Sequence, residues 1–136
     1  MAGKKRVLIL CTKNSCRSIM AEGLINSRLY GFEAESSGID ASGRINPNVK
    51  KILQKYGAWR DSYHSKHIGE IIDKEFDLVV TVCDRAKEHC PVFPKPVPKI
   101  HVEFEDPDGK GIEEFEKLWH DMEKRLLPAV ANFFLY

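Results

Sequence analysis

The stretch RVLILCTKNSCRS, residues 6–18, decides the fold because it passes from an apolar run to a polar turn. Residues 7–11 are all apolar, so we interpret residues 6–11 as a strand covered on both faces, as in a parallel sheet. After the turn, residues 18–30 repeat apolar side chains at helical spacing, and Gly31 is placed to end a helix. The stretch therefore predicts a strand, a polar turn and a helix in succession.

The rest of the chain continues this alternation of short strands and helices. Further strands are expected at residues 34–39, 76–83 and 100–104, and further helices at residues 47–56, 84–90 and 112–133. In 136 residues this alternation predicts one domain, residues 1–136, with a doubly wound α/β sheet of about four parallel strands flanked by helices.

Composition and charge exclude several classes of function. The chain has 21 basic and 20 acidic residues, so it lacks the basic excess of a nucleic-acid-binding protein. Its apolar runs are far shorter than the roughly 20 residues that cross a bilayer. The basic start and the apolar residues 7–10 resemble a secretory signal, but this run is shorter than the roughly 7–15 residues expected of a signal core, and no small-residue cleavage site follows. We therefore expect a monomeric cytoplasmic protein without a nucleic-acid or membrane partner, in which the four cysteines stay reduced.

Three reactive side chains follow predicted strands. Cys11 follows the first strand, Cys83 ends the third, and Asp106 follows the last. Ligands of doubly wound sheets bind at the carboxyl ends of the strands. We therefore expect these three side chains at one edge of the sheet.

The turn after Cys11 has the composition of an oxyanion-binding loop. Successive N–H groups at the start of a helix form a concavity for anions, and the Arg17 guanidinium can hold two oxygens of a tetrahedral oxyanion. The predicted binding residues are Thr12, Lys13, Asn14, Ser15, Cys16, Arg17 and Ser18. A purely structural interpretation, with Cys11 ending a buried strand and Arg17 solvated, leaves the polar loop unexplained.

The same positive surroundings should act on the Cys11 thiol. A helix N-terminus and a neighbouring arginine lower a cysteine pKa from about 8.5 to roughly 3.5–7.5, so Cys11 is expected to be a thiolate nucleophile. Ser18 is a candidate hydrogen-bond donor to it, and Asn14 is expected to hold the loop by side-chain hydrogen bonds. Cys16 is interpreted as structural.

Cys83 and Cys90 form a second group of thiols. In a helix over residues 84–90, their spacing corresponds to two turns and about 10.5 Å of rise, whereas a disulfide needs Cα atoms about 4.4–6.8 Å apart. A disulfide between them therefore requires the segment to unwind. Two inert core cysteines are the alternative, and a zinc site with His89 is disfavoured because no metal-ligand spacing is present. We favour redox use and predict no metal.

Asp106 is the candidate acid. Substitution at an oxyanion expels an oxygen, which leaves more easily when a carboxylic acid protonates it. Asp106 precedes Pro107 in a rigid turn at the edge that carries Cys11, whereas Glu105 and Asp108 are interpreted as a solvated acidic loop.

Together these residues resemble the thioredoxin-coupled arsenate reductases, which share the low-molecular-weight protein tyrosine phosphatase fold. The matching segments are CTKNSCRS at 11–18, MAEG at 20–23, SGI at 37–39, NP at 46–47, DLVVT at 77–81, Cys83, CP at 90–91 and DP at 106–107. The loop is shared with the phosphatases. The pair Cys83 and Cys90 is the part specific to the reductases.

The resemblance implies a relay of three cysteines. Cys11 attacks arsenic while Asp106 helps water to leave, and Cys83 then attacks Cys11 so that arsenite is released. Cys90 next attacks Cys83, and thioredoxin, the external reductant, reduces the resulting Cys83–Cys90 disulfide. Phosphate should bind in the same loop as an inhibitor, and no bound cofactor is expected.

The potassium site of the family is altered in this sequence. Some of these reductases bind potassium through residues that correspond to Asn14, Glu22, Ser36 or Ser37, and an aspartate, whose place Lys66 takes here. A lysine ammonium can replace the cation, so we predict no potassium dependence.

Two alternative functions are weighed against arsenate reduction. A phosphatase acting on phosphotyrosine is disfavoured because Asp108-Gly109 replaces the aromatic residues that such phosphatases usually have there. The other alternative is a non-catalytic arsenite-binding thiol protein.

Overall fold

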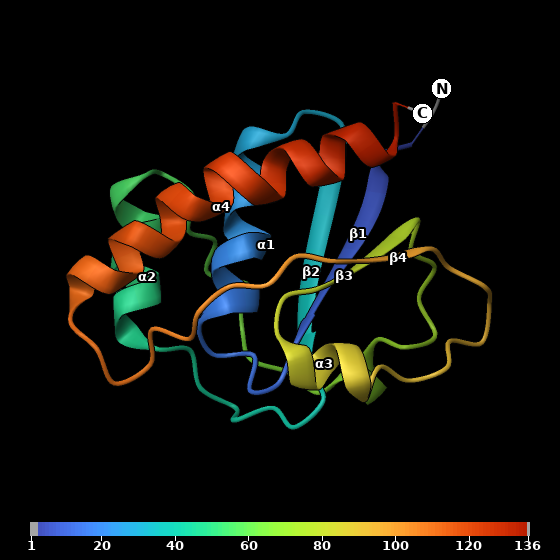
Figure 1. Ribbon diagram of the computed structural model, residues 1–136, viewed down its shortest axis with the longest axis horizontal. Helices are drawn as coiled ribbons and strands as arrows, with labels where there is room; N and C mark the ends of the chain where they lie inside the picture. The colour runs from blue at the N-terminus through green and yellow to red at the C-terminus, as the bar shows by residue number, and fades with distance from the viewer. Residues whose placement is uncertain (1–2, 136) are drawn as a thin grey trace.

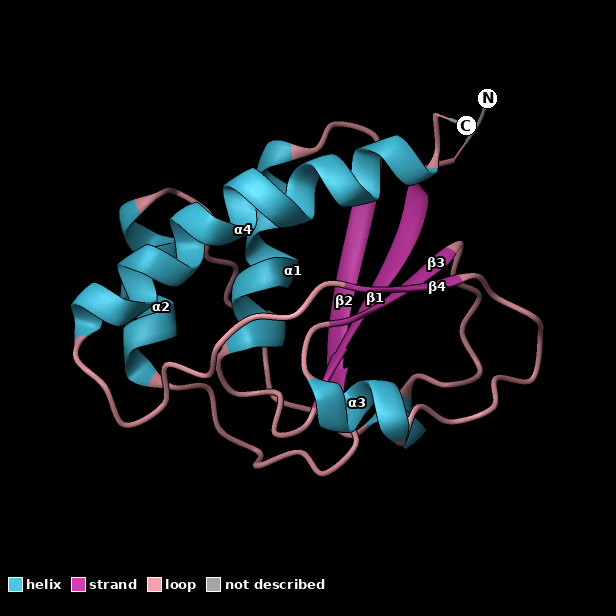
Figure 2. Cartoon of the chain, in the orientation of Figure 1, coloured by secondary structure: helices cyan, strands magenta, loops and turns pink. Residues whose placement is uncertain are grey.

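Four parallel strands form the centre of the protein, in the order β2-β1-β3-β4. The computed structural model describes residues 3–135, and Figures 1 and 2 show the arrangement of its elements. The strands are β1 (Lys5–Cys11), β2 (Phe32–Gly38), β3 (Leu78–Thr81) and β4 (Lys99–His101). The helices are α1 (Arg17–Arg28), α2 (Pro47–Lys55), α3 (Asp84–Glu88) and α4 (Ile112–Phe133), with a 3₁₀ turn at Ile68–Glu70. The predicted doubly wound sheet with four parallel strands is confirmed.

The strand order places a crevice at the end of β1. The chain moves from β1 to β2 on one side and returns to β3 on the other side, so the direction of winding changes between β1 and β3. Parallel sheets bind ligands at the carboxyl ends of the strands that flank such a switch point. The short helix α3 packs against β1 and β3 at this end of the sheet (Figure 1).

The apolar face of each helix forms the core together with the strands. Residues 7–10 of β1 are fully buried, which agrees with the unbroken apolar run seen in the sequence. Helix α1 packs against β1 and β2, and α4 packs across α1 and α2 (Figure 2). The buried stripe of α4 contains Phe115, Leu118, Trp119, Met122, Leu126 and Val130. Within residues 3–135, no helix combines the length and the apolar character that crossing a membrane requires.

All elements begin and end within two residues of the prediction except the last strand, which ends three residues early; β3, β4 and α3 are each shorter than predicted by two residues or more. The strands expected at 76–83 and 100–104 are limited to 78–81 and 99–101. Beyond β4 the pairing continues only as two single bonds, from the N–H of Val102 to Thr81 and from the N–H of Phe104 to Val82.

The helix predicted over residues 84–90 ends at Glu88. The residue before a proline is disfavoured in helical conformation, and Pro91 follows Cys90. Cys90 therefore lies outside α3, whereas Cys83 is its N-cap residue. The expected helix over residues 84–90, with two turns between the thiols, is therefore too long by two residues.

Candidate active site

The loop between β1 and α1 turns its carbonyl groups outward. Four of these carbonyls accept backbone N–H groups from the chain after β2: Cys11 from Ile39 (3.1 Å), Thr12 from Asp40 (2.9 Å), Lys13 from Ser42 (2.9 Å) and Ser15 from Asn46 (3.0 Å). In a trans peptide the next N–H points opposite to the carbonyl, so the N–H groups that follow point into the loop. Inward N–H groups beside a helix N-terminus are the donors that an oxyanion needs.

Asn14 sets the curvature of this loop. Its backbone has φ of 52°, the left-handed region in which asparagine is tolerated better than most residues. Its side-chain Nδ2 donates to Ser18 Oγ (2.7 Å) and Ser36 Oγ (3.0 Å), and its Oδ1 accepts the backbone N–H of Lys66 (2.8 Å). The Asn14 side chain therefore ties the loop to α1, to β2 and to the segment before the 3₁₀ turn.

Gly38, the last residue of β2, allows the loop to lie against the sheet. A Cβ atom on Gly38 would lie 2.5 Å from the Thr12 carbonyl oxygen and 3.1 Å from Asn14 Cβ. A contact of 2.5 Å is too short for any side chain. In the sequence Gly38 stood out only as part of a matched segment. Its position at the end of the predicted strand that pairs with the Cys11 strand could have indicated this packing role.

Arg17 and Asp106 lie beside the nucleophile. Arg17 Nη1 donates to the Phe104 carbonyl (3.2 Å), and Nη2 is 3.6 Å from Asp106 Oδ2. The buried Arg17 Nε has no hydrogen-bond partner among residues 3–135, so it remains available to a ligand. A small hollow is lined by Cys11, Lys13, Asn14, Ser15, Cys16, Arg17 and Asp106. The structure thus brings the predicted nucleophile, guanidinium and acid to one place.

Cys83 also lies next to the oxyanion loop, and it shifts the pKa of Cys11. The Cys83 sulfur lies 3.3 Å from Thr12 Oγ1. The interaction with the Cys83 sulfur and, after it, burial raise the pKa of the Cys11 thiol far above its ordinary value, against the lowering effect of Arg17. The same interaction lowers the pKa of Cys83 to about 5, helped by Thr12.

In this arrangement the pKa shifts favour Cys83, rather than the expected Cys11, as the sulfur that carries the negative charge. Two adjacent sulfurs share one negative charge more easily than they hold two. Both thiols are buried, and the backbone N–H of Ala86 in α3 lowers the pKa of Cys83 further. The sequence placed both cysteines at one edge of the sheet but did not show that their thiols shift one another's pKa.

The two remaining cysteines differ in position. Cys16 is the N-cap residue of α1, and burial raises its pKa to about 11, so its thiol stays protonated at neutral pH. Cys90 is half-buried beyond the other end of α3, where burial raises its pKa. All four cysteines are free, and α3 separates Cys83 from Cys90.

A buried polar cluster of Glu22, Ser36 and Lys66 lies behind Asn14 and supports the loop. Ser36 Oγ donates to Glu22 Oε1 (2.7 Å) and also accepts from Asn14. Burial raises the pKa of Glu22 to about 7, and the positive charge of Lys66 opposes this shift. Both side chains are buried. The ammonium of Lys66 thus supplies a positive charge to the carboxylate beneath Asn14.

Comparisons with known proteins agree with this geometry. The sequence matches the family described as low molecular weight phosphotyrosine protein phosphatase over residues 6–132. It is 39% identical over 117 residues to arsenate reductase 2 of Staphylococcus epidermidis, which covers 85% of this chain and 88% of that protein.

Solved structures of arsenate reductases also resemble this chain. An arsenate reductase from Archaeoglobus fulgidus matches with a TM-score of 0.74 and 31% identity over 87% of this chain and 93% of that one. An arsenate reductase in the phosphate-binding state matches with a TM-score of 0.74 and 27% identity, covering 94% and 98% of the two chains.

Replacing Gly38 should damage the loop directly. In Gly38→Ala the new Cβ would overlap the Thr12 carbonyl, and overpacking of this kind costs about 1–3 kcal/mol. We expect phosphate affinity, measured by isothermal titration calorimetry, to fall roughly tenfold or more, since 1.4 kcal/mol is a factor of ten. Gly3→Ala, which meets open space, is the matched control. Unchanged phosphate affinity in Gly38→Ala would contradict the packing role.

Cysteine titration should assign the negative charge to Cys83. In metal-free buffer, the ¹³Cβ resonance of Cys83 should move with a midpoint near pH 5, because its lowered pKa makes it a thiolate above that value. Cys11 should stay a thiol through neutral pH, and Cys16, with a pKa of about 11, serves as an internal control. A Cys11 resonance that titrates below pH 7 while Cys83 does not would reverse the assignment.

Proposed function

The chain belongs to the low molecular weight phosphotyrosine protein phosphatase family, and we propose that it reduces arsenate to arsenite with thioredoxin as the electron donor. The observation that carries the proposal is Cys83 beside Cys11, with Cys90 beyond α3. A phosphatase of this fold needs only the loop, Arg17 and Asp106. The similarity to arsenate reductases from two organisms supports the proposal.

The first step is attack on arsenic. Arsenate enters the loop, where the inward N–H groups and Arg17 bind its oxygens. The Cys11 sulfur attacks arsenic while the Cys11 proton passes to the adjacent Cys83 thiolate. Asp106 donates a proton to the departing oxygen, which leaves as water. The product is a covalent Cys11–arsenic adduct in which arsenic is still pentavalent.

The second step transfers the electrons. Cys83 attacks the Cys11 sulfur and its proton passes to an oxygen of the arsenic group, while the electron pair of the sulfur–arsenic bond passes to arsenic. Arsenic is reduced from As(V) to As(III) and leaves as arsenite, while Cys11 and Cys83 are oxidised to a disulfide. The Cys83 sulfur is placed for this attack by its interaction with Cys11 and by Thr12 Oγ1, 3.3 Å away.

The third step moves the disulfide outward. Cys90 attacks Cys83, and Cys11 leaves as a thiolate stabilised by Arg17 and the loop N–H groups. Because α3 separates Cys83 from Cys90, its single turn must rearrange for the new bond to form. The bond is then reduced by thioredoxin. A cytoplasmic compartment suits the cycle, because thiols stay reduced there.

Phosphotyrosine hydrolysis is the second candidate function, and the family loop favours it. Against it, the residues after Pro107 offer no aromatic ring to hold a phenol: Asp108 donates its N–H to Asp106 Oδ1 (3.0 Å) and accepts from Asn46 (3.0 Å), and Gly109 follows. An arsenite-binding thiol protein would have no use for Arg17 or Asp106 beside Cys11.

Cysteine variants should stop the relay at different steps. With arsenate, thioredoxin, thioredoxin reductase and NADPH, Cys11→Ser and Cys83→Ser should release no arsenite. Cys90→Ser should release one arsenite per chain and then stop, with a Cys11–Cys83 disulfide visible by mass spectrometry, because that bond forms before Cys90 acts. Sustained turnover of Cys90→Ser with thioredoxin would overturn the proposed relay.

Potassium should leave the activity unchanged, because the Lys66 ammonium already supplies the positive charge beside Glu22. In steady-state assays of the wild type, replacing sodium by potassium should not change the rate. In Lys66→Asp the acidic pair with Glu22 needs a cation, so potassium should raise its activity several-fold. A several-fold gain for the wild type would contradict the role of Lys66.

A further inference from the structure

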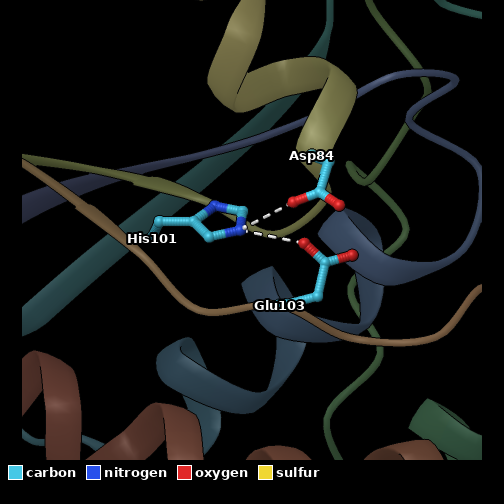
Figure 3. A group of neighbouring side chains, drawn as sticks. All are labelled: Asp84, His101 and Glu103. Atoms are coloured by element: carbon cyan, nitrogen blue, oxygen red, sulfur yellow. Dashed lines mark hydrogen bonds and ion pairs between the residues drawn. The ribbon is translucent and has the colours of Figure 1, made fainter.

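Three potential metal ligands meet at the edge of the sheet, outside the oxyanion loop (Figure 3). His101 ends β4, Asp84 begins α3, and Glu103 lies two residues beyond β4. One oxygen of each carboxylate and one nitrogen of His101 all lie within 4.8 Å of one another. Both carboxylates approach the same ring atom: His101 Nε2 is 2.9 Å from Glu103 Oε1 and 3.5 Å from Asp84 Oδ1.

The other nitrogen of His101 is held by a hydroxyl group. Thr81 Oγ1 lies 2.7 Å from His101 Nδ1 and, at the limit of a hydrogen bond, 3.5 Å from the Ile100 carbonyl. The Thr81 hydroxyl therefore fixes the imidazole ring with its Nε2 atom facing both carboxylates. A cation bound there would take the place of a proton at Nε2 and would contact one oxygen of each carboxylate.

We propose that Asp84, His101 and Glu103 bind a divalent cation of the zinc class. One imidazole nitrogen and two carboxylate oxygens, with the second imidazole nitrogen oriented by a hydroxyl, are a ligand set found around zinc. Around a tetrahedral ion with bonds of about 2.0–2.2 Å, ligand atoms lie roughly 3.3–3.6 Å apart. The separations of 2.9 and 3.5 Å at Nε2 are close to this value. Water completes the coordination on the exposed side.

His120 provides a contrast on the surface of α4. It also contacts two carboxylates, but they lie on opposite ring nitrogens: Glu123 at Nδ1 (2.9 Å) and Glu116 at Nε2 (3.6 Å). Tyr56 shares the Nε2 side, 3.2 Å away. One ion cannot be bound by groups on both sides of an imidazole ring. The convergence on a single nitrogen therefore distinguishes the His101 site from an ordinary surface histidine among acidic residues.

The position of the site links it to α3. Asp84 is the first residue of α3, and His101 belongs to the neighbouring strand β4. An ion bound to both would hold the start of α3 against the sheet. Helix α3 has five residues, of which only Ala86 is buried, so its packing in the sheet is weak without such a link. Binding of the ion should therefore reduce the opening of residues 84–88.

The experiment uses zinc ions with the reduced full-length protein. Titration followed by ¹⁵N NMR of the histidine rings should shift the Nε2 signal of His101 and leave that of His120 unchanged. Affinity measured with a competing zinc dye should fall about tenfold or more in His101→Ala and in Asp84→Asn, and should be unchanged in His120→Ala. The Asp84 side chain is three-quarters exposed, so Asp84→Asn should keep the fold. It therefore tests the site even where His101→Ala fails to fold.

Two further results complete the test. Zinc should slow amide hydrogen exchange of residues 84–88 in the wild type but not in Asp84→Asn. An unshifted His101 signal, or equal zinc affinity in Asp84→Asn and the wild type, would overturn the proposal, since zinc would then bind only to the cysteines or elsewhere. Neither measurement contains arsenate, so the result does not depend on the proposed reductase activity.

Discussion

The close approach of β2 to the loop after β1 is the constraint on which the rest of the site depends. Parallel pairing brings Cys11 opposite Gly38, and the chain beyond Gly38 then binds the loop carbonyls one after another. Because these carbonyls are used outside the loop, the following N–H groups are left for a ligand inside. The anion site is thus a product of strand pairing. This explains how a chain with 21 basic and 20 acidic residues can bind an oxyanion.

The two sulfurs at this site divide the chemistry between them. The interaction between the two sulfurs raises the pKa of Cys11 and lowers that of Cys83. Burial raises and Arg17 lowers the pKa of both thiols, and the backbone N–H of Ala86 in α3 adds to the lowering at Cys83. The pair therefore contains one acid and one base in contact. Such a pair lets Cys83 accept a proton when Cys11 attacks, and it keeps a nucleophile beside the sulfur that must next be attacked.

Local patterns in the sequence predicted the sheet, and the strand order then explains the location of the site. The apolar run at residues 7–11 and the helix that follows were sufficient, because burial on both faces leaves a strong signal. The interaction between Cys11 and Cys83 could not be predicted, since it depends on how the 71 intervening residues pack. The packing role of Gly38 was not evident for the same reason, because the Thr12 carbonyl that it approaches lies in the loop after β1, far away in the sequence.

The end of α3 was also mispredicted, and the physical reason matters for the relay. Pro91 disfavours helical conformation at Cys90, so only five residues remain between the N-cap Cys83 and the C-cap His89. One helical turn fixes several backbone dihedrals for very few hydrogen bonds, so it gains little from local cooperativity. Of its residues only Ala86 is buried, and alanine contributes little apolar area. Rearrangement of this segment therefore costs much less than unfolding any other helix of the protein, and the second pair of cysteines lies where the chain is easiest to remodel.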